Sequence, residues 1–258
     1  MTVVKIGGST LDSRDTTIED IVTIQKRGEQ LIVVHGGGGT VTSWLKRQGI
    51  ETKFVRGERV TDLPTLEVAT AVLAGLVNKE IAAAINSRGG SAVGISGVDG
   101  SLIMARARNR EMGYVGDVAE VNPALLEALL AAGFVPVISP LSMYAVDRPE
   151  GESHIINVNG DPIAGEIAVA VKAARLIFLT DTAGVCDAAG TVLWRLSASE
   201  AADLMDSGVI SGGMIPKINA GLRAFTAGTI TRIIDGRQPH ALVDEMDGRG
   251  SGTLLYKE

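Results

Sequence analysis

The sequence is poor in cysteine and in aromatic residues. Cys186 is the only cysteine among 258 residues, which excludes an internal disulfide framework and leaves too few thiols for a structural zinc site. Aromatic residues make up 3% of the chain and the formal net charge is -6, so neither stacking side chains nor a basic surface is available for nucleic acid. We expect a cytoplasmic protein with no nucleic-acid partner.

Secretion signals and spanning segments are also lacking. Met1 leads directly into a strand-like stretch, without a basic region followed by a long apolar run. The uncharged residues 128–146 contain Gly133, Pro136 and Pro140, which would interrupt a spanning helix. We interpret this stretch as a helix end, a buried strand and a loop, and we expect no membrane partner.

Glycine, by contrast, is abundant and is grouped. Residues 31–34 form a short β-branched run, and four glycines follow at 36–39 ahead of a helix-like segment. Glycine is required where the backbone takes a positive φ or closely approaches a ligand, and free N–H groups before a helix attract anions. The loop is not a P-loop, because no Lys-Ser or Lys-Thr pair follows, and the acidic residue of a dinucleotide fold is missing.

A second glycine turn follows the expected first strand, residues 2–6. Lys5 lies near the end of that apolar strand, where a lysine is costly unless it meets an anion; a lysine that extends to solvent from an edge strand is the alternative. A helix at 17–26 would return the chain to the strand at 31–34. This β-α-β unit places both glycine turns at the same edge of a sheet, where ligands bind.

The rest of the chain continues as one α/β globule. We first expect a helix at 40–48 that buries Val41, Trp44 and Leu45, a charged loop at 54–62 and a long helix capped by Asp62. A strand at 92–95, a hairpin of 102–106 and 114–118, a helix closed by Gly133, and strands at 134–138 and before Asn157 should follow. The last part should contain a helix at 162–171 capped by Asp161, a strand at 176–179, helices after Ser197 and Gly213, and strands at 230–234 and 253–256.

Several charged and amide side chains accompany these glycines. Lys217 stands on a second glycine-rich helix start, where it opposes the helix dipole and therefore needs another reason to be there. Asn157, Asn159 and Asp161 end another strand, and capping alone would explain only Asp161. Three histidines without paired spacing, and no Gly-x-Ser-x-Gly elbow, disfavour zinc or serine hydrolysis. Phosphoryl transfer between two anionic ligands fits best.

Six short motifs, in order over nearly the whole chain, carry a resemblance. They are Lys5-Ile-Gly-Gly, His35-Gly-Gly-Gly, Arg59-Val-Thr-Asp, Asn157-Val-Asn-Gly-Asp161, Thr180-Asp-Thr-Ala-Gly184 and Gly212-Gly-Met-Ile-Pro-Lys217. The chain resembles the amino-acid kinase superfamily, and within it the kinases of N-acetyl-L-glutamate. The resemblance implies a three-layer α/β/α sandwich around an open, mainly parallel sheet. It also implies one kinase domain, in which a lobe of about 1–172 binds N-acetyl-L-glutamate and a lobe of about 173–258 binds MgATP.

The resemblance implies a role for each matching residue. Lys5 and Lys217 would stabilise the transition state, and Asp161 would hold these two mutually repelling cations. The substrate would be bound by Gly36, Gly37, Arg59 and Asn157, with Arg59 clamping the α-carboxylate and Arg56 left in solvent. The nucleotide would be bound by Gly7, Gly8, Thr180, Asp181, Thr182, Gly184, Val185, Cys186, Val209, Ile210 and Ser211.

The implied activity is transfer of the γ-phosphoryl group of ATP to the γ-carboxylate of N-acetyl-L-glutamate, in arginine biosynthesis. A carboxylate with a pKa of about 4.3 is ionised at neutral pH and needs no catalytic base. The lysines, the N–H groups of Gly8 and Gly37, and a Mg²⁺ held by the ATP phosphates rather than by protein ligands would offset the charge that develops.

Two alternatives remain open. Gly39 and Gly160 stand where proline and alanine are common in the family, and both are expected beside the acyl pocket. A kinase of carrier-protein-linked α-aminoadipate or glutamate should present a basic docking face, of which a net charge of -6 gives little sign. A non-catalytic amino-acid sensor of the same fold would be expected to lose Lys5, Lys217 or Asp161, and all three are present.

The oligomeric state is a further expectation from the resemblance. Relatives that arginine inhibits carry an additional N-terminal helix that joins dimers into a ring, whereas the first strand here is expected to begin at about residue 2. The long segment 63–85 offers Leu66, Leu73 and Leu76 to a two-fold interface. We therefore expect a homodimer whose activity is indifferent to arginine.

Overall fold

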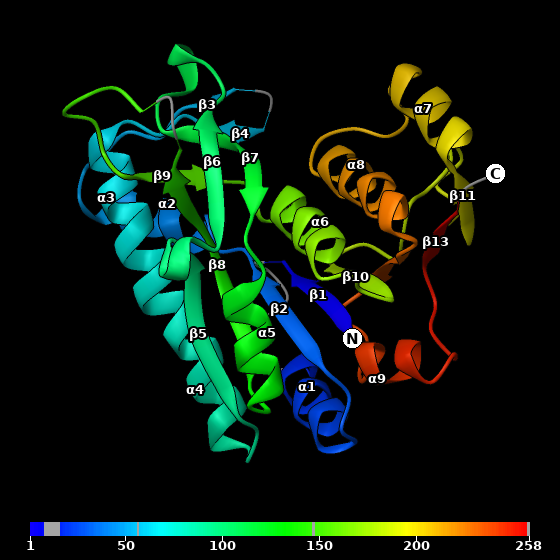
Figure 1. Ribbon diagram of the computed structural model, residues 1–258. Helices are drawn as coiled ribbons and strands as arrows, with labels where there is room; N and C mark the ends of the chain where they lie inside the picture. Colours follow the sequence, from blue (N-terminus) through cyan, green and yellow to red (C-terminus); the bar gives the residue numbers. More distant parts are fainter. Residues whose placement is uncertain (8–15, 56, 146–147, 257–258) are drawn as a thin grey trace.

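One large sheet with helices on both faces organises the molecule (Figure 1). The computed structural model describes residues 1–7, 16–55, 57–145 and 148–256. Within these residues the sheet holds eleven strands in the order β11-β13-β12-β10-β1-β2-β8-β6-β7-β9, with β5 paired to β8. Its strands are β1 (Thr2–Ile6), β2 (Leu31–His35), β5 (Ala92–Gly97), β6 (Ile103–Ala107), β7 (Val115–Val121), β8 (Val135–Tyr144), β9 (Ile155–Val158), β10 (Arg175–Thr180), β11 (Arg195–Ser197), β12 (Ile230–Asp235) and β13 (Thr253–Tyr256).

The helices alternate with these strands along the chain. They are α1 (Thr17–Lys26), α2 (Gly38–Arg47), α3 (Leu63–Thr70), the π-helical stretch η1 (Ala71–Val77), α4 (Asn78–Ser87), α5 (Ala124–Ala131), α6 (Gly160–Ala170), α7 (Ala198–Asp206), α8 (Met214–Ala224) and α9 (Ala241–Met246), with short 3-10 turns at Asp99–Ser101, Arg110–Met112 and Phe225–Ala227. A separate hairpin joins β3 (Phe54–Val55) to β4 (Glu58–Arg59).

The expected three-layer sandwich around a mainly parallel sheet is confirmed. Strand β1 pairs in parallel with β2 and with β10, and the β10–β12 and β2–β8 pairs are also parallel. The β6–β7, β8–β9 and β12–β13 pairs are antiparallel. Parallel neighbours require crossover helices, which cover both faces of the sheet and bury it.

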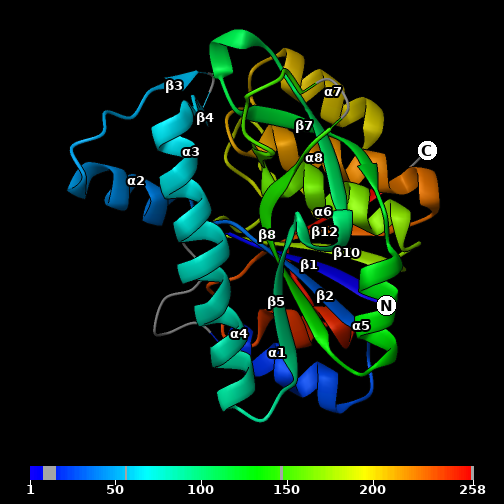
Figure 2. The same ribbon diagram turned by 60° about the vertical axis from the view of Figure 1, so that its left-hand side comes forward.

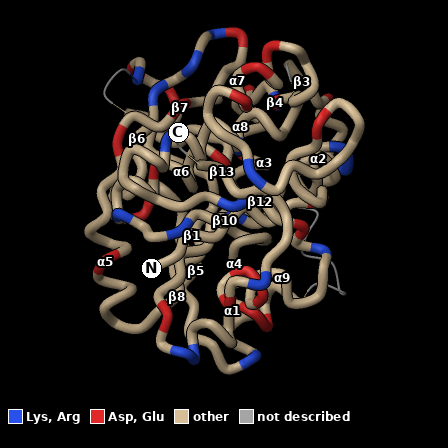
Figure 3. The backbone as a smooth tube through the Cα atoms, turned by 90° about the vertical axis from the view of Figure 1, so that its right-hand side faces the viewer, with Lys and Arg blue, Asp and Glu red and all other residues tan. Residues whose placement is uncertain are grey.

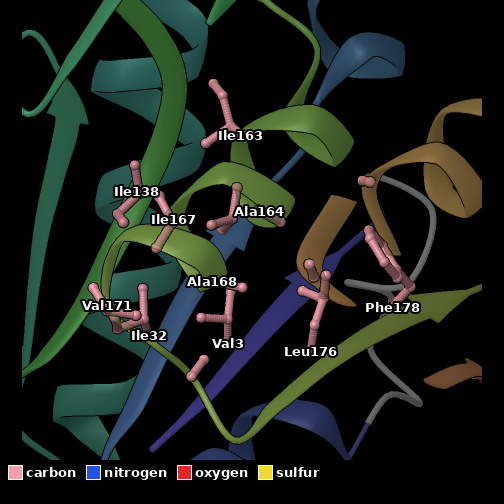
Figure 4. Close-up of a cluster of buried hydrophobic side chains, with 14 of the residues drawn as sticks. Val3, Ile32, Ile138, Ile163, Ala164, Ile167, Ala168, Val171, Leu176 and Phe178 are labelled. Atoms are coloured by element: carbon pink, nitrogen blue, oxygen red, sulfur yellow. The ribbon is translucent and has the colours of Figure 1, made fainter. Parts of the chain in front are cut away.

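The central strands are apolar on both faces, and their side chains alternate between two cores. Val3, Ile32 and Phe178 pack on the side of α6, while Val4 and Val33 pack on the side of α1 and α4. Figure 4 shows α6 beside this first core, to which it contributes Ile163, Ala164, Ile167 and Ala168, followed by Val171 just after the helix. Burial of this many large apolar side chains fixes the register of β1, β2 and β10, and with it the side chains at their ends.

The same alternation sets the direction of two polar residues near the strand ends. Lys5 is two residues beyond Val3, so its side chain lies on the α6 face of the sheet. His35 is two residues beyond Val33, so its side chain lies on the opposite face, with α4. The carboxyl ends of β1, β2 and β10 meet at one edge, as the glycine pattern predicted.

Several local expectations are confirmed and others are wrong. The Asp62 carboxylate caps α3 by accepting the Thr65 N–H, and Ser197 and Glu200 form the predicted capping box. The α6 helix is capped by Asn159, whose side chain accepts the Asp161 N–H at 2.9 Å; Asp161 is therefore not the cap. Its carboxylate is engaged elsewhere, because both of its oxygens lie beside lysine ammonium groups.

The predicted extents of three segments also differ from the structure. Helix α2 begins at Gly38, and Trp44 is 36% exposed and stacks with Arg47 instead of joining the core. Strand β8 continues through Pro140 to Tyr144, where a loop was expected, because β5 pairs with it in parallel through a bulge and β9 pairs with it in the antiparallel direction. The charged loop at 54–62 contains the β3–β4 hairpin.

The longest helical segment is Leu63–Ser87, comprising α3, η1 and α4. It is the one helix in the described part of the chain that is long and apolar enough to cross a membrane, and 44% of its most apolar window is buried. Leu66, Leu73 and Ile85 are buried within the chain. The segment thus has the burial pattern of a helix packed against a sheet, as Figure 2 shows for α3 and α4.

Candidate active site

A pocket opens at the carboxyl edge of the sheet, between α2, the β3–β4 hairpin and the start of α6. Its volume is about 280 Å³, at the small end of the range for organic ligands. The residues predicted to bind substrate, and one predicted catalytic residue, line this one pocket: Lys5, Gly36, Gly37, Arg59 and Asn157. The structure therefore brings together side chains that lie far apart in the sequence.

Two lysines flank one carboxylate at the floor of this region. Lys5 Nζ is 2.7 Å from Asp161 Oδ1, at an angle that makes the contact an ion pair rather than a directed hydrogen bond. Lys217 Nζ donates to Asp161 Oδ2 at 3.0 Å and to the Gly213 carbonyl at 3.1 Å. The side chains of Lys5, Asp161 and Lys217 are 9%, 5% and 13% exposed, so water screens their charges weakly.

The packing of α6 against α8 explains how this cluster forms. The two helices meet at Gly165, where an added Cβ would lie 2.8 Å from the Ala220 carbonyl oxygen, so only glycine permits this approach. Asp161 is four residues before Gly165, and Lys217 is three residues before Ala220. Residues three or four apart share a helix face. The Asp161 carboxylate and the Lys217 ammonium group therefore face each other about one helical turn from the crossing point.

The glycine loop after β2 is held closely on the sheet. The Gly36 N–H donates to the Ile6 carbonyl at 2.9 Å. Gly37 has a φ of 153°, and an added Cβ would lie 2.7 Å from a δ-carbon of Leu73. Any side chain at Gly37 would therefore have a strained backbone and would force the Leu73 side chain to move. The loop leaves room for a ligand directly beside backbone N–H groups.

Arg59 is oriented by contacts that the sequence analysis did not identify. Its Nη2 donates to the Gly38 carbonyl at 2.9 Å and to Thr42 Oγ1 at 2.7 Å, and its guanidinium lies 4.9 Å from the centre of the Phe54 ring. Its buried Nη1 has no partner among the described residues. Burial lowers the pKa of Arg59 from its ordinary value, because the charged form loses hydration. One prong of the guanidinium therefore remains for an anion in the pocket.

Residues at the end of β9 and the start of α6 complete the pocket wall. Asn157 and Asn159 both line it, although the sequence analysis assigned a ligand role only to Asn157. Asn157 Nδ2 lies 3.5 Å from Thr61 Oγ1, which leaves the amide weakly engaged. Gly160 also lines the pocket, and an added Cβ would approach the His35 carbonyl oxygen to 3.3 Å, whereas a Cβ at Gly39 would meet open space.

The segments predicted to bind nucleotide lie around the ends of β10 and α8. Asp181, Thr182 and Ser211 are exposed, and Thr180 ends β10. Three other predicted contacts are buried residues: Gly184, Val185 and Ile210. The remaining members of the predicted set are Gly7, Cys186 and Val209. The Gly7 N–H donates to the Leu179 carbonyl, the backbone of Cys186 forms an isolated antiparallel β-bridge with Val192, and Val209 is half-buried.

Two predictions lie outside the described residues. These concern Gly8, expected to contact the phosphates, and Arg56, expected in solvent. Among the residues that the structure describes, no three or more His, Cys, Asp or Glu side chains gather in a metal-binding group. Both oxygens of Asp161 are taken by lysines, so this carboxylate is not available as a metal ligand.

The charge of the site favours anionic ligands. Lys5, Lys217 and Arg59 contribute three positive charges, and Asp161 contributes one negative charge. Glu58 also lines the pocket, but its carboxylate forms an ion pair with Arg108, the residue directly after β6. The excess of cations, together with the unpartnered Arg59 Nη1 and the loop N–H groups, fits a carboxylate and phosphate oxygens at the same time.

Comparison with known proteins gives a consistent result. The sequence profile of the Amino acid kinase family matches residues 1–235. The chain is 50% identical over 253 residues to a protein named acetylglutamate kinase from Dehalococcoides mccartyi strain CBDB1, covering 98% of this chain and 93% of that protein. It is 46% identical over 262 residues to an acetylglutamate kinase from Synechococcus sp. strain CC9311, covering 98% and 90% of the two chains.

A solved structure extends the similarity to the fold. The crystal structure of smu.665 from Streptococcus mutans UA159 superposes with a TM-score of 0.82 at 27% identity, covering 98% of this chain and 97% of that one. The overall fold is therefore shared with a solved structure.

Proposed function

The chain belongs to the amino acid kinase family, and on that premise we propose that it transfers the γ-phosphoryl group of ATP to the γ-carboxylate of N-acetyl-L-glutamate. The products are N-acetylglutamyl 5-phosphate and ADP, and the reaction belongs to arginine biosynthesis. The observation that carries the proposal is the buried Lys5–Asp161–Lys217 cluster next to a pocket in which Arg59 Nη1 has no partner among the described residues.

The acceptor end of the reaction needs little from the protein. The side-chain carboxylate is ionised at neutral pH, so it attacks the γ-phosphorus without a base. Arg59 Nη1 binds the α-carboxylate, and the Asn157 amide bonds the acetylamino end, which together hold the γ-carboxylate in line with the phosphoryl group. The protein therefore acts mainly by positioning and by offsetting negative charge.

The donor end is served by the lysine cluster. Lys217 stabilises the leaving oxygens of the ADP product, and Lys5 stabilises the oxygens on the side of the acceptor carboxylate. Asp161 keeps the two ammonium groups at fixed positions despite their repulsion. Family membership implies ATP use with a metal; a Mg²⁺, held by the ATP phosphates, would supply further positive charge near the transferring group.

We assign the substrates to different parts of the chain. The pocket that contains Arg59 belongs to about 1–172, and the proposed nucleotide contacts around Thr180, Asp181 and Ser211 belong to about 173–258. Val185 and Ile210 then support the nucleotide segment from within, since their side chains are buried in the core. Contacts from these two positions are limited to the backbone.

Replacement of Arg59 by alanine separates the two substrate sites. We expect Arg59→Ala to raise the KM for acetylglutamate at least about tenfold, because a charged hydrogen bond of about 1.5–3 kcal/mol is lost. The KM for ATP should change little, because the guanidinium contacts one substrate only. Steady-state kinetics with each substrate varied in turn measures both constants.

Arg47→Ala is the matched control for this measurement. Arg47 ends the neighbouring helix α2 and stacks on Trp44 outside the pocket, so its loss should leave both KM values unchanged. An equal rise of the two KM values in Arg59→Ala would contradict the assignment of separate sites.

The product distinguishes this reaction from ordinary ATP hydrolysis. Transfer to a carboxylate gives a mixed anhydride, which hydroxylamine converts to a hydroxamate. We expect hydroxamate to accumulate in step with ADP when acetylglutamate and hydroxylamine are present. Formation of ADP and free phosphate without hydroxamate would contradict transfer to a carboxylate.

We also propose a homodimer. The long helical segment Leu63–Ser87 offers fewer exposed leucines for its interface than the sequence analysis expected. Leu66 and Leu73 are buried within the chain, so they are not available to a partner, whereas Leu63 and Leu76 are 47% and 40% exposed on the same helical segment. We expect light scattering to give twice the chain mass for the wild type and the chain mass for Leu76→Glu. A monomeric wild type would contradict the proposal.

The two alternative functions fit less well. A non-catalytic sensor has no need for the intact Lys5–Asp161–Lys217 cluster, which is present with close contacts. A kinase of carrier-linked substrates would present basic residues to an acidic carrier, but Figure 3 shows lysine and arginine positions interspersed with aspartate and glutamate.

A further inference from the structure

A histidine lies directly beneath the glycine loop and has no part in the proposed mechanism. His35 ends β2, is 0% exposed, and lies on the face of the sheet opposite to Lys5. A fully buried imidazole is rarely without a specific arrangement of partners. Its two ring nitrogens contact two different parts of the site.

The first contact is with the loop itself. His35 Nδ1 lies 2.7 Å from the Gly36 carbonyl oxygen. The second is with the long helix, where Asn78 Nδ2 lies 3.1 Å from His35 Nε2. Asn78 is itself fully buried at the start of α4. The imidazole thus connects the glycine loop to the helix on the other face of the sheet.

The orientation of the Asn78 amide is fixed by its other partners. Its Nδ2 also lies 3.1 and 2.8 Å from the carbonyl oxygens of Ile95 and Val137, so its two hydrogens are shared among three acceptors. Its Oδ1 accepts from Lys79 Nζ at 3.0 Å. Exchange of the amide nitrogen and oxygen would place an acceptor against two carbonyls and a donor against an ammonium group. Asn78 therefore turns its NH2 group, and not its carbonyl oxygen, towards His35.

These two contacts determine which imidazole nitrogen carries the proton. The Gly36 carbonyl oxygen can only accept, so the 2.7 Å contact requires the proton on Nδ1; Nε2 of the neutral ring is then unprotonated, as suits the amide hydrogens of Asn78 beside it. Burial, reinforced by the charges of Lys5 and Lys79, lowers the pKa of His35 to about 4, although the bond to Gly36 opposes this shift. The imidazole is therefore neutral at physiological pH.

The bond to Gly36 also orients the following peptide group. In a trans peptide the carbonyl of one residue and the N–H of the next point in opposite directions, and the described residues contain no cis peptide bond. Since the Gly36 carbonyl is held towards the imidazole, the Gly37 N–H points away from it. Gly37 lines the substrate pocket, and its N–H has no acceptor among the described residues.

We propose that His35 is a positioning residue for phosphoryl transfer. In its Nδ1–H form it holds the Gly36 carbonyl and thereby aims the Gly37 N–H at a negatively charged oxygen of the reacting group, with the Asn78 NH2 group beside the unprotonated Nε2. The proposal rests on the proposed function, since it requires an anionic centre to form in this pocket. Preorganised N–H donors of this kind act mainly on kcat, because the charge they meet develops during the reaction.

The tautomer can be measured without any change to the active site. Nitrogen-15 NMR of the ring nitrogens distinguishes Nδ1–H, Nε2–H and cationic imidazoles, and the chain has only three histidines. We expect His35 to be in the neutral Nδ1–H form at pH 6, where a free imidazole with a pKa of about 6.5 is mostly protonated. Loss of the signal in His35→Asn assigns it. An Nε2–H or cationic His35 would overturn the proposal.

Kinetics of two variants test the effect on catalysis. His35→Leu removes the donor, and we expect kcat to fall about tenfold to hundredfold with both KM values within about threefold of wild type. His35→Asn retains an amide donor near the position of Nδ1 and should recover most of that loss. His154→Leu removes an exposed imidazole and is the control, with no expected change.

The outcomes separate the proposal from the function on which it rests. A His35→Leu variant within twofold of wild-type kcat, or equal losses in the leucine and asparagine variants, would overturn the positioning role. If the leucine variant does not fold, the wild-type spectrum still decides the tautomer on which the role depends. A wild type inactive with acetylglutamate would contradict the proposed function, and would leave the spectrum to decide the state of His35.

Discussion

Lys217→Ala should lower kcat at least about hundredfold, with a much smaller change in either KM, and Lys5→Ala should do the same. Both ammonium groups lie in a site with little water, since their side chains are 13% and 9% exposed. They neutralise charge that moves onto the acceptor and leaving oxygens during transfer, so they bind the transition state more strongly than the ground state. Steady-state kinetics with saturating ATP and acetylglutamate measures the effect.

Lys46→Ala is the matched control, because Lys46 is an exposed lysine on α2 away from the cluster. It should turn over at the wild-type rate. If Lys217→Ala or Lys5→Ala kept a turnover close to that of the wild type, the catalytic assignment of that lysine would be wrong. A rise in KM alone would instead indicate a role in ground-state binding.

Asp161→Asn should have the second large effect, on stability as well as on activity. The carboxylate lies between two ammonium groups, and its removal leaves two buried cations facing each other. Loss of one member of a buried ion-pair cluster costs about 3–5 kcal/mol of the free energy of unfolding. We expect chemical denaturation at pH 7 to show a loss of that size, and kcat to fall at least about hundredfold as the lysines move apart.

The cause of the instability can be tested by a second substitution. If repulsion between the ammonium groups is responsible, the double variant Asp161→Asn with Lys5→Met should be more stable than Asp161→Asn alone. A midpoint of denaturation for Asp161→Asn equal to that of the wild type would show that Asp161 does not hold the lysines in the folded protein.

Local patterns predicted the parts of the site that lie at strand ends. Lys5, the glycines at 36–39 and Asn157 each follow an apolar run, and parallel strands bring their carboxyl ends to one edge. Lys217 was found because a lysine at a helix start opposes the dipole. The ion pairs themselves depend on the crossing of α6 and α8 at Gly165, and no spacing in the sequence indicates which helices cross.

Other features depend on contacts between distant segments and could not be predicted. The orientation of Arg59 comes from Thr42, which is on a different element, and the tautomer of His35 depends on the Gly36 carbonyl and on Asn78 of α4. Cap assignment failed at Asp161 because Asn159, two residues earlier, takes the same role. Arg59, His35 and Asp161 each take their role from a contact with a segment distant in the sequence, which a local pattern does not indicate.

A comparison of acceptors tests the central claim most directly. Purified wild-type protein would be supplied with MgATP and, separately, with N-acetyl-L-glutamate, L-glutamate, L-aspartate or carbamate, while ADP formation is followed by a coupled assay. We expect acetylglutamate to give a kcat/KM at least about tenfold above that of any other acceptor, because the unacetylated compounds leave pocket polar groups unpaired. Faster turnover of glutamate, aspartate or carbamate, or no ADP formation with acetylglutamate, would contradict the proposed function.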